Sequence, residues 1–338
     1  MSSLGAGSGG KAEPQRALRV GVVGAGVMGS NHARVLAGLP GINLAGVVDP
    51  LEAHRTRVSQ FTDCPTFDTL EQLLAGSVDA VTVAAPTHLH HEIALACIAR
   101  KIHVMVEKPI ASSVAEGRDI VDAARRAGVT LMVGHVERFN PAVAAIKQAL
   151  TGEDILSIAI TRVGPFPPRM SNVGVVIDLA VHDIDLIRWF TESDIVEVQP
   201  QLSSAVAERE DIALLQFRTA SGVLAHINTN WLTPFKARNV TVATRGKYVM
   251  GDLLTRQVTE CFGFKPDGSY SMRHLPVGHD EPLRAELIAF LQAVRSGAVP
   301  AVTGDEGVAS LEIATRCLET SARPAASSAR KGPRRVVG

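Results

Sequence analysis

Three glycines behind a short apolar run restrict the fold of this chain more than any other feature. The run at residues 18–23 is rich in valine, and Gly24, Gly26 and Gly29 follow it with the spacing G-x-G-x-x-G. The first glycine of such a motif permits a tight turn, the second lets the backbone approach a pyrophosphate, and the third lets the helix pack closely on the strand. The free N–H groups of that helix attract phosphates. We therefore predict a dinucleotide-binding turn here, with Val27 and Met28 among its contacts.

Apolar runs alternate with helical patterns over residues 17–138. The runs at residues 44–48, 80–84, 103–106 and 130–133 are short and almost uninterrupted, as expected of strands buried on both faces. Alternation of this kind predicts an α/β Rossmann domain with a doubly wound parallel sheet.

The pattern changes after residue 138. A helix is expected at residues 176–190, and the segments behind it read as strands without helices between them, including a hairpin around residues 219–222. We therefore predict an α+β domain over residues 139–322 with a mostly antiparallel open sheet. Because an open sheet face needs a cover, we expect a homodimer or homotetramer to form through it.

Asp49 follows the second predicted strand, twenty residues beyond Gly29. A carboxylate at this place accepts hydrogen bonds from both hydroxyls of the adenosine ribose and repels the additional phosphate of NADP. The predicted cofactor is therefore NAD. An alternative role for Asp49 is to cap the helix that begins near Pro50.

Two segments carry candidate reacting groups. Lys108 closes the fifth predicted strand, where its ammonium can hold a substrate hydroxyl and stabilise an alkoxide, or take a proton. His182 lies four residues after Asp178 and three before Asp185, so the three side chains are predicted to share one helix face. A histidine beside carboxylates is suited to proton transfer near neutral pH. This spacing also suits a metal ion, but no third ligand run is visible and none is predicted.

Taken in order, these motifs resemble the Gfo/Idh/MocA oxidoreductase family over residues 17–322. The resemblance rests on the glycine motif, Pro86-Thr87-His88-Leu89-His90, Glu107-Lys108-Pro109 and the Asp178-x-x-x-His182 pair. It implies that Lys108 and His182 are catalytic and that Asp178 lies in the substrate site. The implied cofactor contacts are Pro86, Thr87, His90, Glu107 and Lys108.

Segments at residues 134–141, 162–169 and 174–185 resemble the branch of this family that oxidises the 3-hydroxyl of UDP-N-acetylglucosamine. The implied substrate is a nucleotide sugar, with Asn140 in its site. Three arginines in these segments are candidates for the diphosphate or the sugar, through charge-assisted hydrogen bonds: Arg138, Arg162 and Arg169. Each is equally compatible with a structural ion pair.

Two other functions remain open. One is a dehydrogenase or ketoreductase of a free monosaccharide or inositol, and the other is a non-catalytic NAD sensor. Intact Lys108 and His182 argue against the sensor, which has no need for an ammonium and an imidazole in this arrangement.

Composition excludes several partners. The formal net charge is +0, so no nucleic-acid partner is predicted. No apolar run approaches the roughly 18 residues of a membrane span, so no membrane association is predicted. The four cysteines are far apart in sequence, which favours free thiols and a cytoplasmic protein. Residues 1–16 and the basic residues 323–338 are predicted to be disordered tails.

Overall fold

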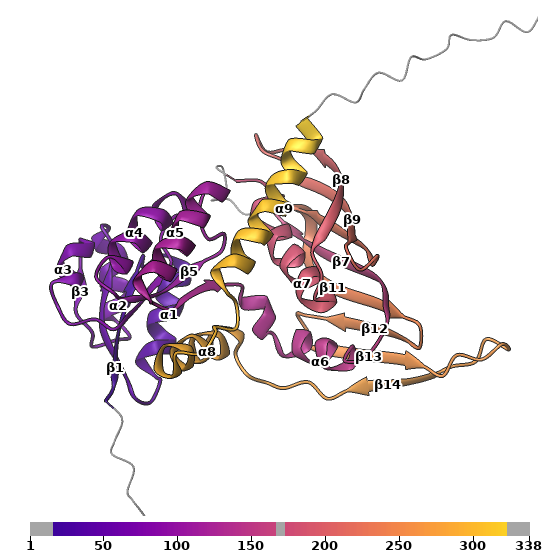
Figure 1. Ribbon diagram of the computed structural model, residues 1–338, viewed down its shortest axis with the longest axis horizontal. Coiled ribbons are helices and arrows are strands. Elements are labelled where there is room, and N and C mark those ends of the chain that lie inside the picture. Colours follow the sequence, from indigo (N-terminus) through magenta and orange to yellow (C-terminus); the bar gives the residue numbers. More distant parts are fainter. Residues whose placement is uncertain (1–15, 167–172, 323–338) are drawn as a thin grey trace, which may run out of the picture.

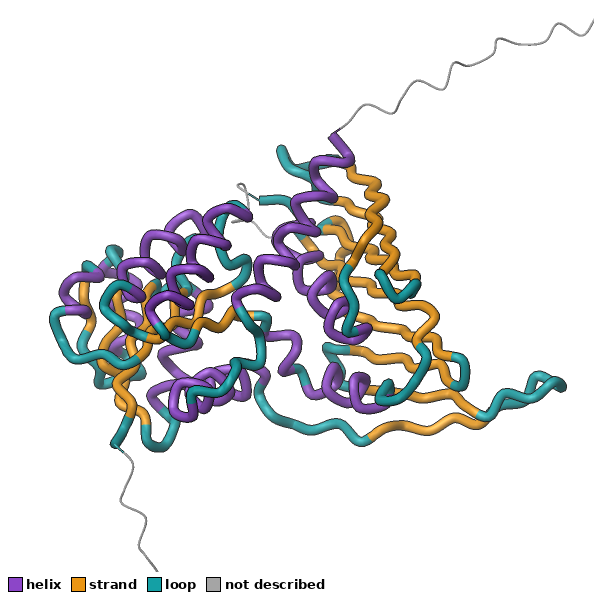
Figure 2. The backbone as a smooth tube through the Cα atoms, viewed as in Figure 1, coloured by secondary structure: helices purple, strands orange, loops and turns teal. Residues whose placement is uncertain are grey.

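The computed structural model describes residues 16–166 and 173–322, which form two sheets covered by helices (Figures 1 and 2). The first sheet has six parallel strands in the order β3-β2-β1-β4-β5-β6. Its strands are β1 (Leu18–Val23), β2 (Ile42–Val48), β3 (Thr66–Phe67), β4 (Ala80–Val83), β5 (His103–Glu107) and β6 (Leu131–Gly134). The helices between them are α1 (Val27–Ala37), α2 (Glu52–Ser59), α3 (Leu70–Leu74), η1 (Thr87–Leu89), α4 (His90–Ile98) and α5 (Val114–Ala127). This order confirms the predicted Rossmann domain.

The strands of the first sheet are buried on both faces, as is typical of parallel sheets. Strand β4 is buried at every position, and β1 and β5 are buried over most of their lengths. Helices lie on both faces of this sheet (Figure 1), so uninterrupted valine-rich segments are the ones that fit it. Because all six strands run the same way, their carboxyl ends meet along one edge. Gly24, Asp49 and Lys108 all follow that edge.

The second sheet has eight strands in the order β14-β13-β12-β11-β7-β10-β9-β8. Its strands are β7 (Ile155–Pro165), β8 (Ile195–Ser203), β9 (Ile212–Thr219), β10 (Leu224–Asn230), β11 (Leu232–Thr244), β12 (Lys247–Asp252), β13 (Gln257–Phe262) and β14 (Ser271–Leu275). Every pairing is antiparallel except β7 with β10, which confirms the predicted class. The predicted hairpin is β9–β10. Strands β8, β13 and β14 were not predicted.

Helices cover one face of the second sheet, as Figure 2 shows. The remaining helices are η2 (Val136–Phe139), α6 (Pro141–Ala149), η3 (Val176–Ala180), α7 (Val181–Thr191), α8 (Pro282–Ser296) and α9 (Gly304–Ala322). The alternating burial of β9 and β10 leaves their other face exposed, including Leu214 and Leu224. The sheet is therefore open on one side of the chain.

The last two helices connect the two cores. Leu287 and Phe290 of α8 pack into the core of the Rossmann domain, although α8 follows the second sheet in sequence. Helix α9 contributes Leu311 to this core and Cys317 to the other. The edge of the first sheet is thereby held against α7. Among the described residues, no helix is long and apolar enough to cross a membrane.

Candidate active site

The turn between β1 and α1 has the geometry that a dinucleotide needs. Gly24 has a φ of 90°, which favours glycine, and a Cβ on Gly29 would lie 1.7 Å from the Gly24 carbonyl oxygen. A Cβ on Gly26 would meet no atom within 4 Å, so the space beside this residue is open to a ligand. Gly26 caps α1 without any side-chain hydrogen bond. The residues present therefore fit a pyrophosphate at the first turn of α1.

Two apolar side chains at the start of α1 flank this space. Val27 is 65% exposed and Met28 is 37% exposed, although both follow a fully buried strand end. Their position agrees with the predicted contacts to the cofactor, which would cover them.

Asp49 lies at the end of β2 and is almost fully buried. Its carboxylate accepts hydrogen bonds from the Ala25 amide at 2.7 Å and the Leu51 amide at 2.9 Å, and His54 Nδ1 lies at 3.1 Å. Although burial opposes it, these hydrogen bonds lower the pKa of Asp49 below its usual value. The carboxylate binds the amide of Leu51, which is itself the N-cap of α2, and no side chain caps that helix, so the alternative role of Asp49 as the helix cap is wrong. Its charge stays beside the glycine turn, so the predicted ribose contact is retained.

We expect Asp49→Ala to narrow the preference of the protein for NAD over NADP. The wild-type carboxylate repels a 2′-phosphate, which should favour NAD by at least about tenfold, or about 1.4 kcal/mol. Titration of intrinsic fluorescence with NADH and NADPH measures both affinities. The control is Asp63→Ala, which changes an aspartate in the loop before β3. If the wild type bound NADH and NADPH with equal affinity, the prediction that Asp49 selects NAD over NADP would be wrong.

Of the residues predicted behind β4, Pro86 and Thr87 remain at the rim of the site and His90 does not. Pro86 is exposed and Thr87 is partly exposed at the start of η1. His90 is buried, and its two ring nitrogens lie 2.9 Å from the Ala85 carbonyl oxygen and 3.0 Å from that of Pro109. Because the ring is buried between two carbonyl oxygens, and its one N–H as a neutral imidazole can be donated to either of them, we correct the assignment of His90. It joins the loops that follow β4 and β5.

Glu107 is also buried and has partners within the protein. Its carboxylate lies 2.9 Å from His32 Nε2 and accepts a hydrogen bond from the Lys108 amide at 3.3 Å. The fully buried Glu286 of α8 is close enough that burial and the Glu107 charge together raise the pKa of Glu286 well above its usual value. Glu107 therefore supports the backbone that carries Lys108, and this corrects its assignment as a direct cofactor contact.

Lys108 and Asp178 form the centre of the site. Lys108 Nζ donates hydrogen bonds to the backbone carbonyl of Asp178 at 2.7 Å and to its Oδ1 at 3.2 Å. Both side chains keep part of their surface exposed, 17% for Lys108 and 23% for Asp178. Asp178 belongs to the π-helical turn η3, a distortion that is frequent at functional sites. The pair joins the carboxyl edge of the Rossmann sheet to the helix that carries His182.

His182 lies in the first turn of α7 and is largely buried. Burial and the positive charges of Lys108, Arg162 and Arg238 lower its pKa well below 6.5. The imidazole is therefore neutral at pH 7 and able to accept a proton. The predicted stripe of carboxylates is wrong at Asp185, which binds Arg138 instead of facing His182.

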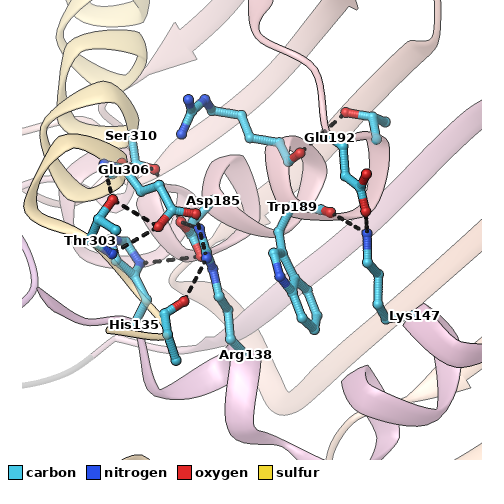
Figure 3. A network of polar contacts seen from close by, with 12 residues as sticks. His135, Arg138, Lys147, Asp185, Trp189, Glu192, Thr303, Glu306 and Ser310 are labelled. Atoms are coloured by element: carbon cyan, nitrogen blue, oxygen red, sulfur yellow. Dashed lines mark hydrogen bonds and ion pairs between the residues drawn. The ribbon is translucent and has the colours of Figure 1, made fainter. Parts of the chain in front are cut away.

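Two of the predicted substrate arginines have internal partners. Arg138 donates to Asp185 at 2.6 and 2.7 Å and to Glu306 at 2.7 Å, as Figure 3 shows. Arg162 donates to Asp183 at 2.7 Å and to Glu137 at 2.9 Å. Both arginines are at most 6% exposed. We therefore correct their assignment as substrate ligands and interpret them as neutralising buried carboxylates.

The remaining predicted substrate residues are Asn140 and Arg169. Asn140 is buried. As the cap of α6 it accepts a hydrogen bond from the Ala142 amide at 3.0 Å, and it donates one to the Leu253 carbonyl at 3.1 Å. It is therefore structural, which corrects its assignment. Arg169 lies outside the described residues.

Arg238 was not predicted. It lies on β11, opposite Arg162 of β7 in the sheet register, and donates to Glu137 at 2.8 Å. Its side chain is 35% exposed, and it carries positive charge toward both Asp178 and His182. No sequence motif marks it, because only the pairing of β7 with β11 brings it to the site. Among the described residues, no group of three or more His, Cys, Asp or Glu side chains is placed to hold a metal ion.

The chain matches models of a known protein family. Residues 18–135 match the oxidoreductase family with an NAD-binding Rossmann fold, known as GFO/IDH/MocA, and residues 155–249 match the GFO/IDH/MocA C-terminal domain. The UDP-N-acetylglucosamine 3-dehydrogenase of Acidithiobacillus ferrooxidans is 29% identical over 70% of this chain and 74% of its own length. An inositol 2-dehydrogenase of Rubrobacter xylanophilus is 34% identical over 63% of this chain and 65% of its own.

Solved structures show the same fold. The structure of the Acidithiobacillus ferrooxidans enzyme aligns with a TM-score of 0.84 and 26% identity, covering 90% of this chain and 98% of that one. A protein of gentamicin A biosynthesis, GenD2, was solved in complex with NAD. It aligns with a TM-score of 0.79 and 25% identity, covering 94% of this chain and 97% of its own.

Proposed function

The chain belongs to the GFO/IDH/MocA family of NAD-dependent oxidoreductases, and from this premise we propose that it oxidises the 3-hydroxyl of UDP-N-acetylglucosamine or a related nucleotide sugar. The observation that supports the reaction is the contact of Lys108 with Asp178 at the carboxyl edge of the Rossmann sheet, where the ammonium is near enough to His182 to lower the pKa of its imidazole. The nucleotide sugar is favoured by the similarity to the Acidithiobacillus ferrooxidans enzyme over almost its whole length.

The side chains divide the reaction between them. NAD, when bound along the glycine turn, supplies the acceptor for the hydride that leaves the substrate carbon. The neutral imidazole of His182 takes the proton of the hydroxyl. Lys108 Nζ holds the oxygen and stabilises its developing negative charge. Asp178 keeps the ammonium in place through its carbonyl and its carboxylate.

A substrate panel tests the proposed activity. Purified protein is incubated with NAD and, separately, UDP-N-acetylglucosamine, UDP-glucose, N-acetylglucosamine, glucose and myo-inositol, and NADH formation is followed by absorbance. We expect the highest kcat/KM with the N-acetylated nucleotide sugar. Higher kcat/KM with myo-inositol would instead support the second candidate, an inositol dehydrogenase, for which the 34% identical inositol 2-dehydrogenase is the supporting observation. Turnover of none of these compounds, with NAD still bound, would favour the sensor.

Arg238 is the described arginine that best fits the negative charge of a nucleotide sugar. It is the more exposed of the two arginines on the β7–β11 pair, and one of its nitrogens is held by Glu137. We expect Arg238→Gln to raise KM for the nucleotide sugar at least about tenfold, the loss of one charge-assisted contact of about 1.5–3 kcal/mol. The affinity for NAD should stay unchanged.

The matched control is Arg245→Gln, which changes an exposed arginine at the other end of β11 that pairs with Asp154. Steady-state kinetics and NADH titration on both variants measure the effect. An unchanged KM in Arg238→Gln would exclude this arginine from the substrate site.

We also propose that the chain forms a homodimer or homotetramer through the open sheet face. Leu214 and Leu224 are each 49% exposed there, on paired strands. We expect Leu214→Glu to lower the molar mass measured by light scattering, because a charge buried between two sheets is costly. Val299→Glu, at an 81% exposed position away from the sheet, is the control. A monomeric wild type would contradict the proposal. The cytoplasmic location, favoured by four cysteines that are all free, remains a prediction.

A further inference from the structure

A second histidine lies beside His182 and has no part in the reaction described above. His135 follows directly after β6, and β6 pairs with β5 so that Gly134 lies opposite Glu107. His135 therefore emerges next to Lys108 along the carboxyl edge of the sheet. It is 1% exposed, which is unusual for a histidine that serves neither a metal nor a visible hydrogen bond of its Nδ1 atom.

The two imidazole rings meet edge to face. Their centroids lie 6.1 Å apart and their planes are inclined by 88°, the T-shaped arrangement that aromatic rings prefer. His182 approaches this contact from α7, whereas His135 comes from the Rossmann domain. The contact thus spans the two domains at the place where the reaction occurs.

His182 lacks the usual means of holding its ring. In most catalytic histidines, a carboxylate or carbonyl binds the second ring nitrogen and fixes the plane. The Nδ1 atom of His182 is buried and has no hydrogen-bond partner among the described residues. Asp178 is turned toward Lys108, and Asp185 toward Arg138. The contact that the structure shows for the His182 ring is therefore the T-shaped one with His135.

A network of buried charges lies beside His135. Its Nδ1 lies 3.8 Å from Oδ2 of Asp185, and Asp185 receives two hydrogen bonds from Arg138. Arg138 also binds Glu306, which accepts hydrogen bonds from the Thr303 amide and hydroxyl at the start of α9. Figure 3 shows these side chains converging from η2, α7 and α9. The network fixes the buried charges beside His135, and the ring of His135 packs against them.

We propose that His135 is a positioning residue that fixes the plane of the His182 imidazole through its ring edge. The inference rests on the proposed role of His182 as the proton acceptor. In this proposal, packing against a neighbouring ring supports the His182 imidazole, in place of the hydrogen bond to the second nitrogen that is general for catalytic histidines.

The test compares two substitutions of His135. His135→Ala removes the edge, and turnover should fall about tenfold or more because small displacements of reacting groups are costly. His135→Phe keeps an aromatic edge without ring nitrogens and should stay close to the wild-type rate. Thermal unfolding and NADH titration on each variant establish that the protein is folded and binds cofactor.

The pH profile supplies a readout that loss of stability does not move. The charged and titratable groups that act on His182 are Lys108, Arg162, His135 and Arg238, and burial is the main cause of its low pKa. Opening a cavity beside it in His135→Ala hydrates the ring, so the acid limb of kcat/KM should shift upward, toward 6.5. The limb should remain at its wild-type position in His135→Phe.

A matched control removes a buried ring elsewhere. Phe217→Ala opens a cavity in the core of the second sheet, and Phe217 is 4% exposed. It should lower the melting temperature with kcat and the acid limb unchanged. If Phe217→Ala lost kcat and shifted the acid limb as much as His135→Ala does, the proposal would be overturned, because any destabilised core would then have this effect.

Two other results would also overturn it. A folded His135→Phe as slow as His135→Ala would show that the ring nitrogens are needed, as in a proton relay. Wild-type turnover in His135→Ala would show that no positioning occurs. If His182→Ala is also fully active, then the proposed function fails as well; if His182→Ala is inactive, the failure is confined to His135.

Discussion

Replacing His182 by alanine is expected to lower turnover at least about a hundredfold, since loss of a general base typically costs about 10²–10⁴ in rate. Binding of NAD should be unchanged, because the glycine turn and Asp49 lie on other elements. Steady-state kinetics on the true substrate and NADH titration measure the two properties. His91→Ala, at a partly exposed histidine that pairs with Asp119, is the control.

The pH dependence of the wild type gives the same assignment a second test. Burial and the charges of Lys108 and Arg162 lower the pKa of His182 well below 6.5. A base loses activity when it is protonated, so kcat/KM should stay constant through neutral pH and fall only at pH values well below 6.5. This acid limb should disappear in the residual activity of His182→Ala. Near-wild-type turnover of that variant would show that another group takes the proton.

Replacing Lys108 by alanine is expected to have a comparable effect for a different reason. In the proposed mechanism its ammonium holds the oxygen whose negative charge develops as the hydride leaves, and removal of one such donor costs about 10²–10³ in turnover. The variant should bind NAD normally. Lys108→Arg keeps the charge but changes its shape and reach, so we expect it to recover only part of the rate.

The control for Lys108 is Lys101→Ala, at an exposed lysine before β5. Because Asp178 loses its partner in Lys108→Ala, thermal unfolding should accompany the kinetics. A stable Lys108→Ala variant with near-wild-type turnover would remove Lys108 from the mechanism. If both Lys108→Ala and His182→Ala were fully active, the active site would have to lie elsewhere.

The sequence by itself determined the Rossmann domain, and it marked the candidate cofactor edge and the two candidate reacting side chains. The glycine motif is local, because φ at Gly24 and the close approach at Gly29 depend on neighbouring residues. Residue types and their spacing are therefore sufficient to predict the turn. Strands buried on both faces must be apolar along their length, and this also is visible in the chain. Lys108 was predictable because the end of a parallel strand fixes its place.

Only the tertiary structure decided which charges serve the substrate site and which serve the core. Arg138, Arg162 and Arg238 look alike in sequence, and their roles depend on carboxylates that distant segments bring within reach. The spacing rule for α-helices also failed to predict which side chains share a face with His182. A π turn precedes α7 and holds more residues per turn than an α-helix, and Asp185 is drawn to Arg138, so the predicted stripe is broken.

His135 and Arg238 reach the site through sheet register, which a single chain does not display. The neighbour of a strand residue is set by pairing across many intervening residues, as with Arg162 of β7 and Arg238 of β11. Local periodicity therefore predicts which side chains point inward, but the partners of a buried charge follow from long-range packing. For this protein, the reacting atoms are encoded in short motifs, and their electrostatic surroundings arise only when the two domains fold against each other.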